Sequence, residues 1–163
     1  KAVAVTLARF PDLNGFWRDG RHEPSAAVHV GVAISLRQGG LAAPALLDVP
    51  DKPLDQLMRE LSDLVKRTRA FPLRSSELAM PTVTVTNLGD QGVESVFGVI
   101  YPPQVALVGF GRPTERAWVA DGALRIGPVV TASLAADHRA SDGHRGALFL
   151  AELKALLQHP EAL

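Results

Sequence analysis

The sequence predicts an α/β fold, a two-layer sandwich of a mixed β-sheet and helices. Residues 82–88 (TVTVTNL) alternate valine with threonine, which is the period of a strand. Residues 53–69 place leucines on one stripe and charges elsewhere, as an amphipathic helix does. The apolar segment 27–36, with frequent β-branched residues, predicts a buried strand, and residues 104–110 predict another strand.

The other elements are predicted from residues that end helices and from the spacing of apolar residues. Residues 1–10 are expected to end a helix that Pro11, Asp12 and Asn14 close, and a short apolar run covers residues 41–49.

In the second half, a strand at 129–135 is expected to connect to the strand at 104–110 by a hairpin-like link through Asp121-Gly122. Pro72 is expected to end the 53–69 helix, and a final helix is predicted at 143–158.

The composition is that of a globular domain, and residues 1–163 are expected to form one domain. Apolar residues make up 47% and charged residues 21% of the chain, and seventeen basic residues balance seventeen acidic ones. This balance argues against a nucleic-acid or membrane partner. The lack of cysteine excludes disulfides and cysteine-ligated metals and agrees with a reducing compartment, for which we expect the cytoplasm, or the mitochondrial matrix in a eukaryote.

The beginning of the chain indicates a fragment. Lys1 leads directly into the apolar residues of a helix, with no capping residue before it. We therefore expect an upstream part of the domain to be missing from this sequence.

The segment Asp137–Gly143 (DHRASDG) carries the first candidate site. It follows a predicted strand and precedes a predicted helix, a position from which side chains project beyond a sheet. His138 is a candidate general base, because histidine titrates near neutral pH, and Asp142 follows four residues later. The alternative interpretation is that Asp142 only caps the helix and His138 is a surface histidine.

Thr86 is the second candidate, at the end of the 82–88 strand. Its hydroxyl could donate a hydrogen bond to an oxyanion, and Gly89 would let a ligand approach the backbone. Alternatively, Thr86 is the third outward threonine of a half-buried strand whose inner face carries Val83 and Val85.

The other histidines carry less information. His29 is expected in the core or an interface, and His22, His144 and His159 are expected to face solvent. No pair has the i, i+4 spacing of a helical zinc site, so no metal is expected. The sequence also lacks a phosphate-binding loop, a dinucleotide fingerprint and a serine-hydrolase elbow.

The DHRASDG motif resembles the catalytic domain of the dihydrolipoyl acyltransferases, the core components of 2-oxo acid dehydrogenase complexes. Four further segments share the resemblance: PDLNGFW (11–17), VHVGVAIS (28–35), DLVKRTRAFPL (63–73) and TVTVTNLGDQGVESVFGVIYPPQVALVGFG (82–111). The related chloramphenicol acetyltransferases share the H-x-x-x-D-G pattern, but the DHR form is similar to the lipoyl-dependent branch.

The resemblance implies a coenzyme-A-dependent acyltransferase fold that forms a homotrimer, with trimers joining into a core of 24 or 60 subunits. It implies coenzyme A and a lipoyl-lysine arm as substrates, no metal, and 2-oxo acid decarboxylase and dihydrolipoamide dehydrogenase as partners. His138 would be the base, Thr86 of the adjacent subunit would stabilise the tetrahedral intermediate, and Asp142 would support the site. Candidates to line the channel are Val96, Phe97, Val99 and Ser133.

Three departures from the family pattern lie near this channel. Thr86 stands where serine is usual, Val96 stands where phenylalanine is usual, with Phe97 one place later, and Tyr101 replaces an asparagine before the double proline. The acyl group is therefore left open between acetyl and branched-chain acyl, with succinyl less favoured. Two alternative functions are a chloramphenicol-type O-acetyltransferase and a core scaffold without activity.

Overall fold

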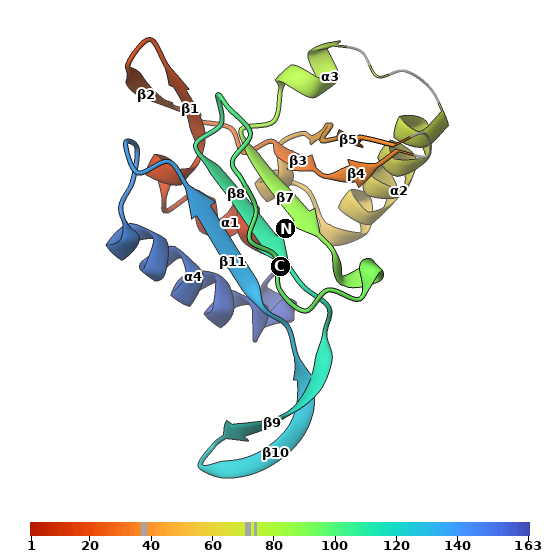
Figure 1. Ribbon diagram of the computed structural model, residues 1–163, viewed down its shortest axis with the longest axis vertical. Helices are drawn as coiled ribbons and strands as arrows, with labels where there is room; N and C mark the ends of the chain where they lie inside the picture. The colour runs from red at the N-terminus through yellow and green to blue at the C-terminus, as the bar shows by residue number, and fades with distance from the viewer. Residues whose placement is uncertain (37–38, 71–72, 74) are drawn as a thin grey trace.

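The computed structural model describes residues 1–36, 39–70, 73 and 75–163, and it confirms the two-layer α/β architecture (Figure 1). A five-stranded sheet has the order β11 (Ala132–Ala136), β8 (Ala106–Phe110), β7 (Val83–Asn87), β3 (Val30–Val32) and β6 (Ala45–Leu46). The three central strands are parallel, and both outer strands are antiparallel to their neighbours. The sheet is therefore mixed, as predicted.

Three helices pack against one face of this sheet: α1 (Ala2–Leu7), α2 (Leu54–Ala70) and α4 (Gly143–Leu157). Their apolar stripes meet the inward side chains of the strands, so that Leu57, Phe149 and Val83 belong to one buried cluster. The rings of Phe10 and Phe149 meet edge to face with centroids 5.7 Å apart. Among the described residues, no helix has the length and apolarity needed to cross a membrane.

The loop of residues 93–104 covers part of the opposite face. The Ser133 hydroxyl donates a hydrogen bond to the Val96 carbonyl, and the Gly109 Cα lies so close to Val96 that an added Cβ would come within 3.0 Å of the valine Cβ. Thr84 is buried beside Gln104 of this loop, and Thr82 is buried against Asn14 and His29. The prediction of a half-buried β7 strand was wrong for these two threonines because sequence alternation does not show which segments return over the sheet.

Three two-stranded ribbons and five short helices complete the chain. The ribbons are β1 (Gly15–Arg18) with β2 (Arg21–Pro24), β4 (Ile34–Ser35) with β5 (Leu41–Ala42), and β9 (Thr114–Ala120) with β10 (Ala123–Val129). The short helices are α3 (Ser75–Ala79), η1 (Pro11–Leu13), η2 (Val49–Asp51), η3 (Gly89–Gln91) and η4 (Pro160–Ala162). The β9–β10 ribbon projects away from the sheet (Figure 1).

The long helices confirm their predictions, whereas several boundaries differ. The helix expected at 1–10 ends at Leu7 and is followed by the turn η1, and the strand expected at 27–36 is divided at Ala33 between β3 and β4. The apolar run at 41–49 holds β5 and β6. The expected stop at Pro72 lies outside the described residues.

The prediction of a hairpin-like link through Asp121-Gly122 was only partly right. Asp121 and Gly122 do form the turn, with φ of 52° and 73°, but they join β9 to β10 rather than the two sheet strands. The strand expected at 129–135 starts at Ala132, because Val129 still belongs to β10. A second Asp-Gly turn, Asp19-Gly20, closes the β1–β2 ribbon, which the sequence analysis missed.

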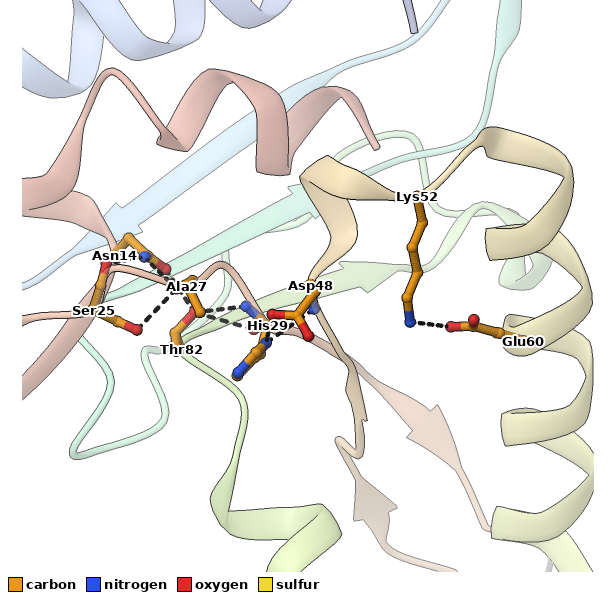
Figure 2. A network of polar contacts seen from close by, with 8 residues as sticks. All are labelled: Asn14, Ser25, Ala27, His29, Asp48, Lys52, Glu60 and Thr82. Carbon is orange, nitrogen blue, oxygen red and sulfur yellow. Dashed lines mark hydrogen bonds and ion pairs between the residues drawn. The ribbon is translucent and has the colours of Figure 1, made fainter.

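Buried polar contacts join the first strands to the sheet (Figure 2). Thr82 Oγ1 donates to Asn14 Oδ1 at 2.6 Å, and Asn14 Nδ2 donates to the carbonyls of Ser25 and Ala27 at 2.9 and 3.0 Å. His29 Nδ1 accepts from the Asp48 backbone N–H at 3.0 Å, so the ring has a partner as predicted, but the residue is half-buried rather than part of the core. Asn14 is thus a structural residue of the core, not simply a turn residue.

Candidate active site

His138 lies in a tight turn between β11 and α4. The turn is closed by hydrogen bonds from the backbone N–H groups of Ala140 and Ser141 to the Asp137 carbonyl, at 2.9 and 3.1 Å. The His138 side chain is exposed, and its ring has no hydrogen-bond partner within the described part of the chain. The imidazole is therefore presented outward by an ordered backbone.

Asp137 anchors the upstream side of this turn. Its carboxylate is only 9% exposed and accepts three hydrogen bonds from the Arg139 guanidinium, at 2.6, 2.9 and 3.2 Å, as well as one from the Arg139 backbone N–H. These hydrogen bonds lower the pKa of Asp137 to about 2, against the opposing effect of desolvation. Arg139 also stacks on Trp17 of β1, with Cζ 4.5 Å from the ring centroid.

Asp142 anchors the downstream side. It is the N-cap of α4, and its Oδ1 accepts from the Arg145 backbone N–H at 2.9 Å. The capping interpretation of Asp142 is thus correct, and it is compatible with a supporting role in the site, because the cap sets where the helix begins relative to His138.

Asp12 ties the same turn to the beginning of the chain. Its Oδ2 accepts from the Ser141 hydroxyl at 2.9 Å, and its two oxygens accept from Arg145 at 2.8 and 3.2 Å. The hydrogen bonds from Arg145 are the main reason that the pKa of Asp12 lies below its usual range. Arg145 in turn lies over the Phe10 ring, with Cζ 4.7 Å from its centroid.

His138 borders an open groove of about 360 Å³ that runs along α4. Its lining is largely small and apolar: Leu134, Ala136, Ser141, Asp142, Gly143, Gly146, Ala147 and Leu150. An exposed imidazole beside an apolar groove can accept a proton from a group that binds there.

Thr86 lies in a second groove, of about 400 Å³, on the sheet face opposite the three helices. Its polar lining includes Thr84, Thr86 and Gln104, and apolar side chains of β5, α3 and the 88–101 loop form most of the rest. Val96, Phe97 and Val99, predicted as channel candidates, line this groove, and Phe97 is 90% exposed. Ser133 instead holds the loop onto the sheet through the Val96 carbonyl.

The two grooves are separate within one chain. Thr86 pairs with Gly109 of β8, and Gly109 pairs with Ser133 of β11, so these residues share one row across the sheet. β11 continues from Ser133 to Ala136, which is roughly 10 Å along the sheet at about 3.3 Å per residue, and His138 lies in the turn beyond the end of that strand. One chain therefore does not bring His138 and Thr86 to a common point.

His144 and His159 are exposed as expected, but His22 is half-buried and its Nε2 is enclosed without a hydrogen-bond partner among the described residues. Asp12, Arg145 and Gln104 escaped the sequence analysis, since each acts through partners that are distant in the chain or on another element.

Comparison of the sequence with known protein families identifies the family of this chain. The model of the 2-oxoacid dehydrogenases acyltransferase (catalytic domain) family matches residues 1–163. The chain belongs to this family. The resemblance noted in the sequence and the acyltransferase fold are thereby confirmed.

Relatives in the acyltransferase family match nearly the whole chain. The chain is 34% identical, over 98% of its length, to the dihydrolipoyllysine-residue acetyltransferase component of the pyruvate dehydrogenase complex of Rhizobium meliloti (strain 1021). It covers 36% of that relative, so the chain spans about a third of its length.

Solved structures of acyltransferase cores share the fold. The dihydrolipoamide acetyltransferase of Azotobacter vinelandii superposes with a TM-score of 0.90 at 29% identity, over 99% of this chain and 67% of that one. The cubic core of a pyruvate dehydrogenase multienzyme complex gives a TM-score of 0.90 at 30% identity, with the same coverage of both chains.

Proposed function

We propose that this protein transfers an acyl group between a dihydrolipoyl-lysine arm and coenzyme A, as the acyltransferase core of a 2-oxo acid dehydrogenase complex. The observation that carries the proposal is the turn at His138: an exposed imidazole, held from both sides by Asp137 and Asp142, at the edge of an apolar groove. The names of the relatives favour acetyl over a branched-chain acyl group.

The reaction needs only the side chains that these grooves contain. His138 accepts the proton of the attacking thiol, because a free thiol is only slightly ionised near neutral pH. The thiolate adds to the thioester carbonyl, and the Thr86 hydroxyl donates a hydrogen bond to the resulting oxyanion. When the tetrahedral intermediate collapses, the carbon–sulfur bond to the departing thiol breaks, and that sulfur takes the proton back from the imidazolium.

The separation of the two grooves supports a site shared between copies of the chain. His138 of one subunit would face Thr86 of the next, which requires at least a dimer and, in the family's architecture, a trimer. We propose that trimers join into a larger core, as in the cubic core whose fold this chain shares, and that the decarboxylase and dihydrolipoamide dehydrogenase components bind to that core.

A solved relative supports the residue assignment through the spacing of three residues along its chain. In the Azotobacter vinelandii enzyme, a serine, a histidine and an asparagine have been investigated for roles in the catalytic mechanism. Thr86, His138 and Asp142 follow one another at the same distances along the chain as those three residues do.

The direct test is acyl transfer by His138→Ala. Loss of the base is expected to lower kcat about 10²- to 10⁴-fold with an acetylated lipoyl domain and coenzyme A, while the oligomer stays intact by light scattering. A rate close to wild type would refute the mechanism and favour a scaffold. Strong preference for a hydroxyl acceptor over dihydrolipoamide would instead indicate a chloramphenicol-type enzyme.

A further inference from the structure

A buried amide in the Thr86 groove has no role in the mechanism above. Gln104 is only 5% exposed, yet it lines the groove together with Thr84 and Thr86. Its backbone is held in place, since its N–H donates to the Tyr101 carbonyl at 3.0 Å and the residue forms a β-bridge with Phe16. The side chain is therefore positioned by its surroundings.

Among the described residues, only the oxygen of this amide has a hydrogen-bond partner. Thr84 Oγ1 donates to Gln104 Oε1 at 2.7 Å, and within the described part of the chain Nε2 has no partner. The only enclosed side-chain polar atom without a partner, among the described residues, is Nε2 of His22. The Gln104 nitrogen is thus not fully enclosed, and the residue belongs to the lining of the open groove.

The hydrogen bond from Thr84 determines which end of the amide faces the groove. A threonine hydroxyl that donates to the amide oxygen directs the amide nitrogen away from itself. In the open groove water can accept from this nitrogen, and a ligand that displaces the water must supply an acceptor, because leaving the amide donor without a partner costs free energy.

The groove offers polar groups at two levels along β7. Thr84 and Thr86 are two residues apart on the same strand and share a face, which separates them by roughly 7 Å. The Gln104 amide is hydrogen-bonded at the Thr84 level, and the groove walls are otherwise largely apolar. Such a groove suits a narrow arm with an acceptor at each level and methylene groups between them.

We propose that Gln104 is a binding residue that donates a hydrogen bond to an amide carbonyl of the substrate arm in this groove. The inference rests on the proposed function, in which the reacting thioester carbonyl lies at Thr86. Coenzyme A and the lipoyl-lysine arm both carry an amide that methylene groups separate from the sulfur. The shared chemistry is therefore a thiol arm with an amide, and the experiment identifies which arm uses the groove.

The test compares Gln104→Leu with the wild type and with Gln91→Leu, an exposed glutamine that serves as control. KM and kcat are measured with coenzyme A and with dihydrolipoamide as the varied substrate, and equilibrium binding of each is measured by calorimetry. We expect Gln104→Leu to raise KM and Kd for one arm about 10-fold, with kcat within about 3-fold and the other arm unaffected.

A matched pair of ligands separates recognition from a structural effect. A dithiol with the methylene chain of dihydrolipoamide but no amide, and an alkanethiol in place of coenzyme A, should bind the wild type and Gln104→Leu equally well. If Gln104→Leu does not fold, Gln104→Glu keeps the acceptor for Thr84 and removes the donor, and the same rise in KM is expected.

The outcomes are distinguishable. Unchanged KM and Kd for both arms, or an equal fall in kcat with both substrates, would overturn the role of Gln104. A wild-type protein that binds an arm but transfers no acyl group would refute the proposed function, while the binding comparison would still decide the subsite. If the wild type binds neither arm, the subsite is refuted as well.

Discussion

At the scale of single residues, Asp12 controls the position of His138 without contacting it. Asp12 binds Ser141 and Arg145, which lie on either side of the N-cap Asp142. The position of His138 in the groove thus depends on a carboxylate more than a hundred residues earlier in the chain. The active turn is tied to η1 through hydrogen bonds as well as through packing.

Asp12→Asn is expected to lower kcat about 10-fold and to change KM for either substrate less than about 2-fold. The amide keeps the shape but loses the charge-assisted hydrogen bonds, and a small displacement of a catalytic base is costly. Steady-state kinetics with both substrates varied measures this. Glu152→Gln, which removes another link to the beginning of the chain, at Arg9, is the control. An equal loss in both variants would contradict the positioning role.

Residues that act through local motifs could be predicted from the sequence, and residues that act through tertiary contacts could not. His138 and Asp142 share one short segment, so their spacing was readable, and Thr86 ends a strand with clear alternation. Asp12 and Gln104 are ordinary polar residues until the fold brings them to Ser141 and Thr84.

At the scale of elements, the turn between β11 and α4 is stabilised by an ion pair that responds to acid. The pKa of Asp137 is lowered from 3.8 to about 2, so its ion pair with Arg139 contributes stability above the unfolded pKa. That contribution is lost as the pH falls from 3.8 towards 2, where the folded carboxylate is also protonated.

Asp137→Asn is therefore expected to lower the free energy of unfolding by about 1–2 kcal/mol at pH 7, and the difference from wild type should shrink at pH 3 and below. Denaturant unfolding at several pH values measures both. Asp63→Asn, which breaks the exposed pair with Arg67, should cost less than about 1 kcal/mol. A difference for Asp137→Asn that stays constant with pH would contradict the assignment.

The loop over β8 depends on a glycine at the end of that strand. A Cβ at Gly111 would lie 1.9 Å from the Glu94 carbonyl oxygen, a clash with backbone that side-chain motion cannot relieve. Gly111→Ala is expected to destabilise the fold by about 2 kcal/mol or more and to loosen the Thr86 groove. Gly127→Ala, with no atom within 4 Å of the added group, is the matched control in thermal unfolding. Equal Tm values for the two variants would contradict this packing.

Helices were easier to predict than ribbons, for a physical reason. The apolar stripes of α2 and α4 face the same core, so the helical spacing of apolar residues can be recognised within each helix alone. The β9–β10 ribbon has no core of its own: Trp118 and Ile126 are both exposed, and its residues therefore show no alternation between a buried and an exposed face. The turn was visible in Asp121-Gly122, but the strands beside it were not.

At the scale of the whole molecule, the two candidate residues His138 and Thr86 line different grooves of one chain. The His138 groove runs along α4, and the Thr86 groove lies on the opposite face of the sheet. Sequence periodicity reports which residues are neighbours within one chain, so it cannot show how two copies meet. The resemblance to a trimeric family supplied that expectation, and the sheet register, which separates His138 from Thr86 within one chain, agrees with the proposal of a shared site.

Subunit complementation between His138→Ala and Thr86→Ala tests the shared site most directly. Each variant alone is expected to lose at least about 10²-fold in kcat. Oligomers formed by co-expression of equal amounts should recover about a quarter of wild-type turnover, because an intact site needs the right variant on both sides of one interface. Mixed oligomers, verified by mass spectrometry, that stay as inactive as the parent variants would show that His138 and Thr86 do not meet across subunits.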